Sequence, residues 1–376
     1  MRISWQALVG ISVGLLLAAL IAGWIRPRPG PVATGPMLAD RGGAIRTAVI
    51  QFVAGSDAVL PVYREFLGQL PAEVTVYAAC PEPADFDILR SAVGSVQCQL
   101  RAVYTHHPMT AWSRDRWVAL HPPTPDGPIT LLAPRGESGA NIWPTRAGDE
   151  KIAEDLGQAI RPGLVSRRSS LYFDGGDFLA EDDRVFIAPR VRAQNLGHTC
   201  ANAEELRAAL QAEMHLMPTF LENAPEHHVG MFMMAAGART MLVADPGLAR
   251  PLYESVPMEE RAPLPAPADF SAATQARFDA VAQQLAALGY RVVRIPVVPA
   301  QQSRVYLTYV NVILDHQGGR DIVYLPIFRG AAPLNKLATE IWASLGYQVR
   351  PVDCTSVYSF GGTLHCLVNV LQRAAD

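Results

Sequence analysis

The sequence predicts an α/β domain built from repeated small modules, with an apolar segment in front of it. Strand-like runs rich in β-branched residues alternate with amphipathic helical runs along the chain. Two helical runs end in the same Leu-Gly-Tyr corner, at Tyr290 and Tyr347, and each corner leads into a strand. Self-similarity on this scale indicates quasi-symmetric modules around a common axis. A plain doubly wound sheet would lack the extra strands between the two corners.

The expected elements follow one order along the chain. Glycine just past a helix end caps the helix, and the β-branched residues behind it start a strand. Two further apolar runs lie between the corners, so one unit consists of a helix and three strands. From Arg46 to Asp376 there is room for about five or six such units. Strands are expected at 46–53, 73–79, 291–298, 304–314, 321–328 and 348–354, and helices at 57–70, 275–288 and 335–345.

Residues 1–25 are expected to anchor the chain in a membrane. The stretch from Ile3 to Ile25 carries no charged residue, and about 20 apolar residues suffice to span a bilayer. Trp5 and Trp24 stand at its two ends, as in an interfacial belt. A signal peptide that is cleaved to give a secreted protein is the alternative, whereas a soluble helix fits poorly with so uniform a run. We expect the folded domain to be extracytoplasmic, in the periplasm.

Residues 26–45 are rich in Pro and Gly and aperiodic, so a linker is expected there and the folded domain should span 46–376. With 376 residues, of which 49% are hydrophobic, the chain can bury a large core. Its formal net charge of −3 excludes the basic surplus of a nucleic-acid-binding protein. The sequence indicates no particular oligomeric state.

The cysteines have no CxxC spacing, so a zinc site is not expected. In an exported domain, Cys80 and Cys98 could pair, because they flank a short helical stretch. An odd cysteine would then remain as a free thiol, and Cys366 is the candidate. The other two cysteines are Cys200 and Cys354.

Four polar segments stand out, each at a strand end or a tight turn. Taken singly, each fits an ordinary feature: an ion pair on a strand, an Asp-Gly turn, a structural histidine or a buried cysteine. The segments are residues 110–120 with Asp115 between Arg114 and Arg116, residues 172–190 with Asp174 and Asp177 around a Gly-Gly pair, residues 225–246 with His227 and His228, and residues 359–369 with Gly361, Gly362, His365 and Cys366.

Together these segments supply the groups that nucleophilic catalysis by cysteine needs. A neutral thiol attacks poorly, so Cys366 requires a nearby proton acceptor. A histidine such as His228 can assist the attack and later deprotonate water. Carboxylates would be needed in addition if the electrophile were cationic, because a buried guanidinium requires paired anions.

With these motifs the chain resembles the pentein, or guanidine-modifying, superfamily, and most of all its agmatine deiminase and bacterial peptidylarginine deiminase branch. The resemblance spans roughly residues 46–373. Residues 294–314 resemble the penultimate module of the family, in which one strand precedes a strand with a Tyr-x-Asn motif. The other matching motifs are Trp-x-Arg-Asp at Trp112, Arg114 and Asp115, the Gly-Gly carboxylate strand at 174–178, the His-x-Asp strand at 228–232, and the closing Gly-Gly-x-x-His-Cys at Gly361, Gly362, His365 and Cys366.

This resemblance implies a five-module α/β propeller, the pentein fold, with quasi-fivefold symmetry and the active site on its central axis. It also implies that Cys366 attacks a guanidinium carbon and that His228 protonates the leaving nitrogen and then activates water. Asp115, with Asp177 as second choice, would hold the guanidinium nitrogens. Neither a metal nor an organic cofactor is implied.

The remaining residues of the matched motifs are expected to line the substrate site, and the Gly-Gly turn should leave room for the substrate. They are Trp112, Arg114, Gly361 and Gly362. If residues 363–366 continue a strand, His365 should point away from Cys366, so we assign it no catalytic role.

The chain departs from the family pattern at two places. Gly230 stands where the family has the aspartate of its His-x-Asp motif, and residues 116–118 replace the Gly-Pro that usually follows the early motif. The predicted function is a hydrolase, a deiminase acting on agmatine, arginine or peptidyl-arginine-like substrates with release of ammonia or an amine and a ureido product. The alternatives are an amidinotransferase and, because of Gly230, a membrane-tethered binding protein with weakened catalysis.

Overall fold

The computed structural model describes residues 34–136 and 148–374. A compact unit begins at Gly35. The expected membrane anchor at residues 1–25 lies outside the described residues, and so does the linker up to residue 33. None of the helices in the described part has the length and apolar character needed to span a bilayer.

The folded unit begins before Arg46, the start expected from the sequence. Residues 35–45, assigned to the linker, are packed into it: Met37 forms a bridge with Leu120, and the Leu38 N–H donates to the Ala119 carbonyl. Asp40 is buried as well. Proline and glycine indicate irregular backbone but do not show whether it is packed. The same composition therefore fits a free linker and an extended segment that packs against the domain.

Five small sheets form the described part of the chain, and they share one pairing pattern. In each, an antiparallel pair of strands is followed, after a helical crossover, by a parallel strand. The antiparallel pair is a hairpin in four of the sheets, whereas in the sheet of β1 it joins the first and last strands of the folded unit. The strands, sheet by sheet, are β17 (Val368–Arg373), β1 (Ile45–Gln51), β2 (Thr75–Cys80) and β3 (Gln99–Tyr104); β4 (Val118–Leu120), β5 (Ile129–Ala133) and β6 (Leu164–Arg168); β7 (Phe178–Glu181), β8 (Arg184–Ile187) and β9 (Met217–Phe220); β10 (Met233–Ala235), β11 (Thr240–Asp245), β12 (Arg291–Pro299) and β13 (Tyr306–Thr308); β14 (Ile313–Gln317), β15 (Arg320–Ile327) and β16 (Gln348–Asp353).

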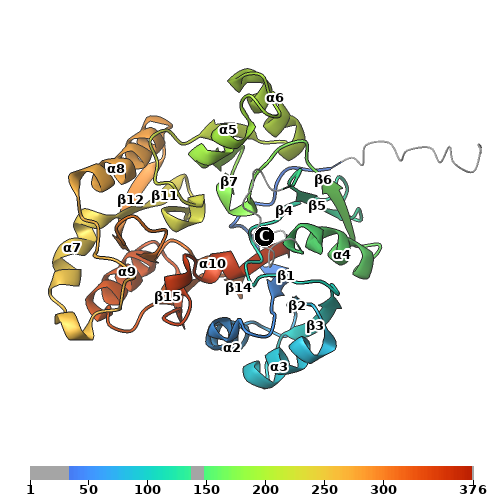
Figure 1. Ribbon diagram of the computed structural model, residues 1–376, viewed down its shortest axis with the longest axis horizontal. Helices are drawn as coiled ribbons and strands as arrows, with labels where there is room; N and C mark the ends of the chain where they lie inside the picture. The colour runs from blue at the N-terminus through green and yellow to red at the C-terminus, as the bar shows by residue number, and fades with distance from the viewer. Residues whose placement is uncertain (1–33, 137–147, 375–376) are drawn as a thin grey trace, which may run out of the picture. The chain divides into compact units, whose positions relative to one another are not determined.

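The crossover helices pack on the sheets that they connect, α9 on β15 and β16 and α4 on β5 and β6, for example. In Figure 1 the helices α3, α6 and α7 lie at the periphery of the unit, whereas α10 and β1 lie near its centre. The α-helices are α2 (Leu60–Leu67), α3 (Pro83–Val93), α4 (Ile152–Ala159), α5 (Pro189–Asn195), α6 (Ala203–Met214), α7 (Pro246–Glu254), α8 (Ala272–Ala287), α9 (Ala332–Ser344) and α10 (Leu364–Leu367), and the 3-10 turns are η1 (Asp57–Val59), η3 (Asp149–Lys151), η4 (Gly175–Asp177), η5 (Val229–Met231), η6 (Met258–Glu260) and η7 (Tyr358–Phe360).

The two Leu-Gly-Tyr corners are confirmed. Gly289 and Gly346 have φ of +83° and +92°, in the region that favours glycine, and end α8 and α9. The N–H of each following tyrosine then donates back to a carbonyl of the helix. The single strand expected at 304–314 is wrong, because this run forms β13 and β14 in two different sheets. Its continuous apolar character reflects burial on all sides rather than one strand.

Candidate active site

Cys366 lies in α10, one helical turn that precedes β17, and not in a strand as the sequence indicated. Gly361, with φ of +89°, reverses the chain just before this turn. The Cys366 carbonyl accepts a hydrogen bond from the Arg114 N–H at 3.2 Å. The turn that carries the candidate nucleophile is therefore tied to the Trp-x-Arg-Asp segment.

Asn311 holds the Cys366 turn from the other side. It is fully buried, and its Oδ1 accepts hydrogen bonds from the Thr363 hydroxyl at 2.6 Å and the His365 N–H at 3.1 Å. Cys366 Sγ lies 3.6 Å from the same oxygen. Asn311 Nδ2 donates to the Gly230 carbonyl at 3.1 Å, so one amide joins this turn to the segment that carries His228.

His228 lies directly before η5 and between two carboxylates. Its Nε2 is 3.5 Å from Asp174 Oδ2, and its Nδ1 is 3.9 Å from Asp115 Oδ1. Burial opposes a charge on this ring, but hydrogen bonds to Asp174 and Cys366 outweigh it and raise the pKa of His228 to about 10. Arg190 Nη2 lies 3.2 Å from His228 Nε2. When the imidazole is protonated, Arg190 carries the same charge and cannot accept its proton, so the Nε2–H donates to Asp174 instead.

Asp174 and Asp177 hold different positions although they share one Gly-Gly turn. Asp177 is fully buried, and its carboxylate accepts from Arg190 and from the Asp174 N–H. Asp174 instead faces His228, pairs with Arg190 and lies 3.0 Å from Arg116. Burial alone would raise the pKa of Asp174, but Arg190, His228 and Arg116 hold it well below its usual range. Asp174, rather than the expected Asp177, is therefore the carboxylate of this turn at the candidate centre.

Two glycines permit these close approaches. A Cβ on Gly175 would lie 2.3 Å from the Arg114 carbonyl, and a Cβ on Gly176 would lie 2.5 Å from His228 Nδ1. The Gly175 N–H donates to the Asp115 carbonyl at 2.7 Å. The Gly-Gly pair thus brings the segment of Asp115 and the ring of His228 together.

The residues expected to line the substrate site have different surroundings. Arg114 is buried and points to Asp40, at 3.1 Å, and to Asn369, at 3.3 Å, so its guanidinium supports the core. Trp112 is half-buried, and its ring fills the space beside Gly362, where a Cβ would lie 2.6 Å from the indole. The room left by Gly362 is therefore taken by Trp112.

The position where the family has an aspartate is also occupied. A Cβ on Gly230 would lie 2.9 Å from His365 Nδ1 and 3.5 Å from Asn311 Nδ2. His365 does not follow strand alternation, because α10 is helical. Its ring lies against Gly230 instead.

The other cysteines are free and buried. The pairing of Cys80 with Cys98 that export would allow is not formed. Burial raises the pKa of Cys80 to about 12 and that of Cys98 to about 11, and it also raises the pKa of Cys354. These three thiols are poor nucleophiles at neutral pH.

Sequence reasoning missed two residues of this centre. Asp40 falls in the segment expected to be a linker, and Arg190 ends the segment 172–190 without an expected role. Their charges alone gave no signal, since only the fold brings Arg190 to the Gly-Gly turn and Asp40 to α10.

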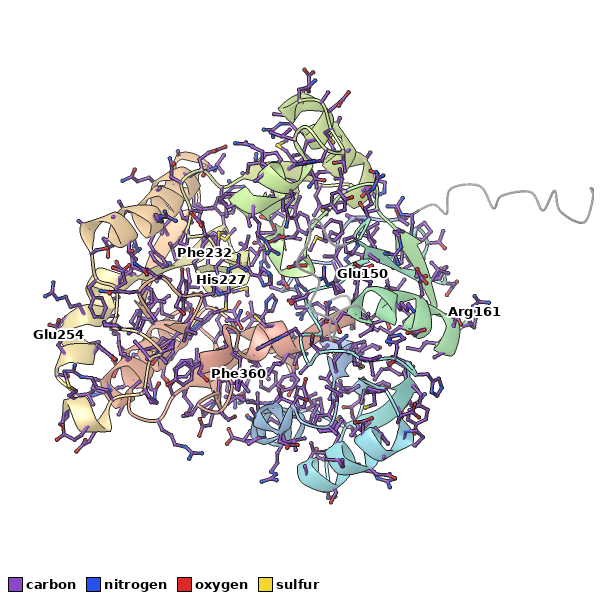
Figure 2. The ribbon with its side chains drawn as sticks, in the orientation of Figure 1. Glu150, Arg161, His227, Phe232, Glu254 and Phe360 are labelled. Carbon is purple, nitrogen blue, oxygen red and sulfur yellow. The ribbon has the colours of Figure 1, made fainter. Side chains whose placement is uncertain are left out.

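Figure 2 shows His227, the neighbour of His228, and Phe232 toward the middle of the unit, whereas Arg161 and Glu254 lie at its edge.

No family model matches the sequence, and neither does any curated protein. Solved structures do. An agmatine deiminase from C. jejuni is similar with a TM-score of 0.64 at 13% sequence identity, over 91% of this chain and 97% of that chain. An agmatine deiminase from Enterococcus faecalis is similar with a TM-score of 0.65 at 13% identity, over 90% of this chain and 96% of that one. This chain shares the fold of these deiminases. The resemblance drawn from the sequence motifs is thereby confirmed at the level of the fold, and so is the expected α/β class.

Proposed function

We propose that this chain is a hydrolase that acts on guanidinium groups through a covalent intermediate on Cys366. The observation that carries the proposal is the position of His228 between Asp115 and Asp174, 3.9 Å and 3.5 Å from its two ring nitrogens, where an interaction with Cys366 also helps to raise the pKa of the imidazole. An imidazolium beside a cysteine favours the thiolate, which is the nucleophilic form. Buried carboxylates beside a thiolate suit a cationic substrate and disfavour an anionic one.

The proposed reaction has two steps. The Cys366 thiolate attacks the guanidinium carbon, His228 donates its proton to the leaving nitrogen, and ammonia or an amine departs to leave a thiouronium-type adduct. His228, now neutral, takes a proton from water, which attacks the same carbon, and the thiolate leaves as the ureido product forms. Asp115 and Asp174 hold the guanidinium nitrogens, and Asp177 keeps Arg190 in place.

A cavity next to Arg190, whose Nη2 lies 3.2 Å from His228 Nε2, offers a place for the rest of the substrate. It measures about 300 Å³ and is lined by Arg190, His227, Glu226 and Arg304, among others. This volume is at the lower end for small-molecule sites, in the range of an aliphatic amine or amino acid. Agmatine, arginine and peptidyl-arginine-like compounds are therefore the substrates to test.

We also infer that the five sheets are the modules of the expected quasi-fivefold propeller, with Cys366 near its axis. The pairing pattern that all five share supports this inference. The anchored, periplasmic location expected from residues 1–25 is a further proposal.

The test is to incubate the purified chain with agmatine, arginine and N-acetylarginine amide and to assay ureido product and ammonia. We expect turnover of at least one compound, abolished in Cys366→Ala and retained in Cys80→Ala. A haloacetamidine probe should label Cys366 and leave Cys366→Ala unlabelled. Labelling of another cysteine in Cys366→Ala would contradict the covalent mechanism.

The same assay separates the two alternatives. An amidinotransferase would form product only when a primary amine such as glycine is added, with no ureido compound. A binding protein would bind a guanidino compound and release nothing.

A further inference from the structure

A second histidine lies beside the candidate nucleophile and has no part in the proposed steps. His365 directly precedes Cys366 in α10 and is 5% exposed. Its Nε2 lies 2.8 Å from Asp40 Oδ1, and Asp40 also pairs with Arg114. Burial favours the protonated form of Asp40, but Arg114 and His365 outweigh it and lower the pKa of Asp40 to about 2. Asp40 is thus an ionised acceptor for the Nε2–H of His365.

This hydrogen bond selects the tautomer of the ring. With the proton on Nε2, Nδ1 carries a lone pair and can only accept. Burial lowers the pKa of His365 more than Asp40 raises it, so the ring is neutral at neutral pH. Within residues 34–136 and 148–374, the hydrogen bonds of His365 involve Nε2 and the backbone N–H, and none reaches Nδ1.

Nδ1 of His365 lies beside the backbone of the segment that carries His228. The nearest feature there is Gly230, whose missing Cβ leaves room for the ring. Gly230 lies two residues after His228 and directly before Met231, and both of those neighbours contact Cys366, with 3.9 Å between the two sulfur atoms. Nδ1 thus lies beside the backbone segment that carries two neighbours of the Cys366 thiol.

We propose that His365 Nδ1 accepts a hydrogen bond from a guanidinium N–H of the substrate and that Asp40 positions the ring for this. The inference rests on the proposed function and names a specificity-determining residue for it. A guanidinium presents five N–H donors in a plane, more than two carboxylates on one side can satisfy. A neutral imidazole supplies a further acceptor without adding a third negative charge to the pocket. His365 therefore favours guanidinium groups that keep an N–H on this side.

The experiment measures the affinity of agmatine and arginine by calorimetry, in the full-length chain carrying Cys366→Ala so that no adduct forms. His365→Leu removes the acceptor at similar volume, and His365→Asn places an amide oxygen near the position of Nδ1. We expect His365→Leu to weaken binding by about 10- to 150-fold, the range for a hydrogen bond to a charged group, and His365→Asn to retain most of the affinity. The control is His316→Leu at the exposed pair of His316 with Asp321, 2.9 Å apart, where affinity should not change.

Gly230→Ala keeps the imidazole but places a methyl group 2.9 Å from Nδ1. Gly230→Ala should also weaken binding of the guanidino compounds, by roughly 10-fold or more. If His365→Leu does not fold, Gly230→Ala alone tests the hydrogen bond to His365. Unchanged affinity in Gly230→Ala or in folded His365→Leu overturns the inference, and so does a folded His365→Asn that binds as weakly as His365→Leu. If the Cys366-containing chain still turns over the same compounds, the proposed function survives that result. A chain that neither binds nor turns over a guanidino compound overturns both.

Discussion

His228 is a partly buried histidine whose neighbours determine its charge at neutral pH. An ordinary histidine, with a pKa near 6.5, is mostly neutral there, whereas hydrogen bonds to Asp174 and Cys366 keep this one protonated. The sequence identified His228 and Cys366 as partners, because each stands in a motif. It did not distinguish Asp174 from Asp177, because both flank the same glycines and only the fold shows that Asp174 lies beside His228 while Asp177 is fully buried.

The raised pKa of His228 predicts a stability that falls with rising pH. Because the folded-state pKa is about 10 and the unfolded value about 6.5, the contribution is complete below pH 6.5 and is lost as pH rises toward 10. Within this window, each pH unit lowers the free energy of unfolding by up to about 1.4 kcal/mol for one titrating group. The melting temperature of the wild-type chain should therefore fall more between pH 7 and pH 10 than that of His228→Gln, as differential scanning calorimetry would measure. Parallel curves for the two proteins would show that His228 is not protonated in the folded state.

At the scale of elements, short glycine turns bring the charged groups together. The helices and strands expected around the Leu-Gly-Tyr corners are confirmed, because hydrophobic period and capping are local signals. The helical conformation of α10 was not predictable, since its Leu-His-Cys-Leu run is too short to show a helical period and only Asn311 shows how the turn is held. The same limit hid the roles of Gly176 and Gly362, which depend on rings from distant segments.

Gly176→Ala should reduce activity far more than it reduces stability. The added methyl group would lie 2.5 Å from His228 Nδ1, so the ring has to move away from Asp115 and Asp174. Misplacement of a catalytic group by about 1 Å can cost roughly 100-fold in rate, and we expect a loss of kcat/KM of that order. The matched control is Gly163→Ala, where the nearest atom would be 3.4 Å from the new methyl group and both rate and melting temperature should stay near wild type. A fully active Gly176→Ala would show that the position of His228 is not critical.

At the scale of the whole molecule, the repeated corner indicated modules, and motif spacing indicated which family fold they form. The start of the folded unit was set too late, because burial of Met37 and Asp40 depends on partners such as Leu120 and Arg114, which are distant in sequence. The prediction of a membrane anchor at residues 1–25 depends on composition alone, and a long apolar run is a strong signal for such an anchor.

The last prediction concerns that anchor. The full-length chain should fractionate with membranes, whereas residues 35–376, which form the compact unit, should be soluble. Leu16→Arg with Leu17→Arg places two charges in the middle of the apolar run, each at a cost of about 2.5–3.5 kcal/mol at the bilayer centre, and should release the chain from membranes. Leu16→Ile with Leu17→Ile, which keeps the hydrophobicity, is the control and should stay bound. A reporter fused after Asp376 would show on which side of the membrane the domain lies, and we expect the periplasmic side. Recovery of the uncleaved, full-length chain in the soluble fraction would contradict the anchor, and recovery of a shortened chain outside the cell would favour the cleaved signal peptide instead.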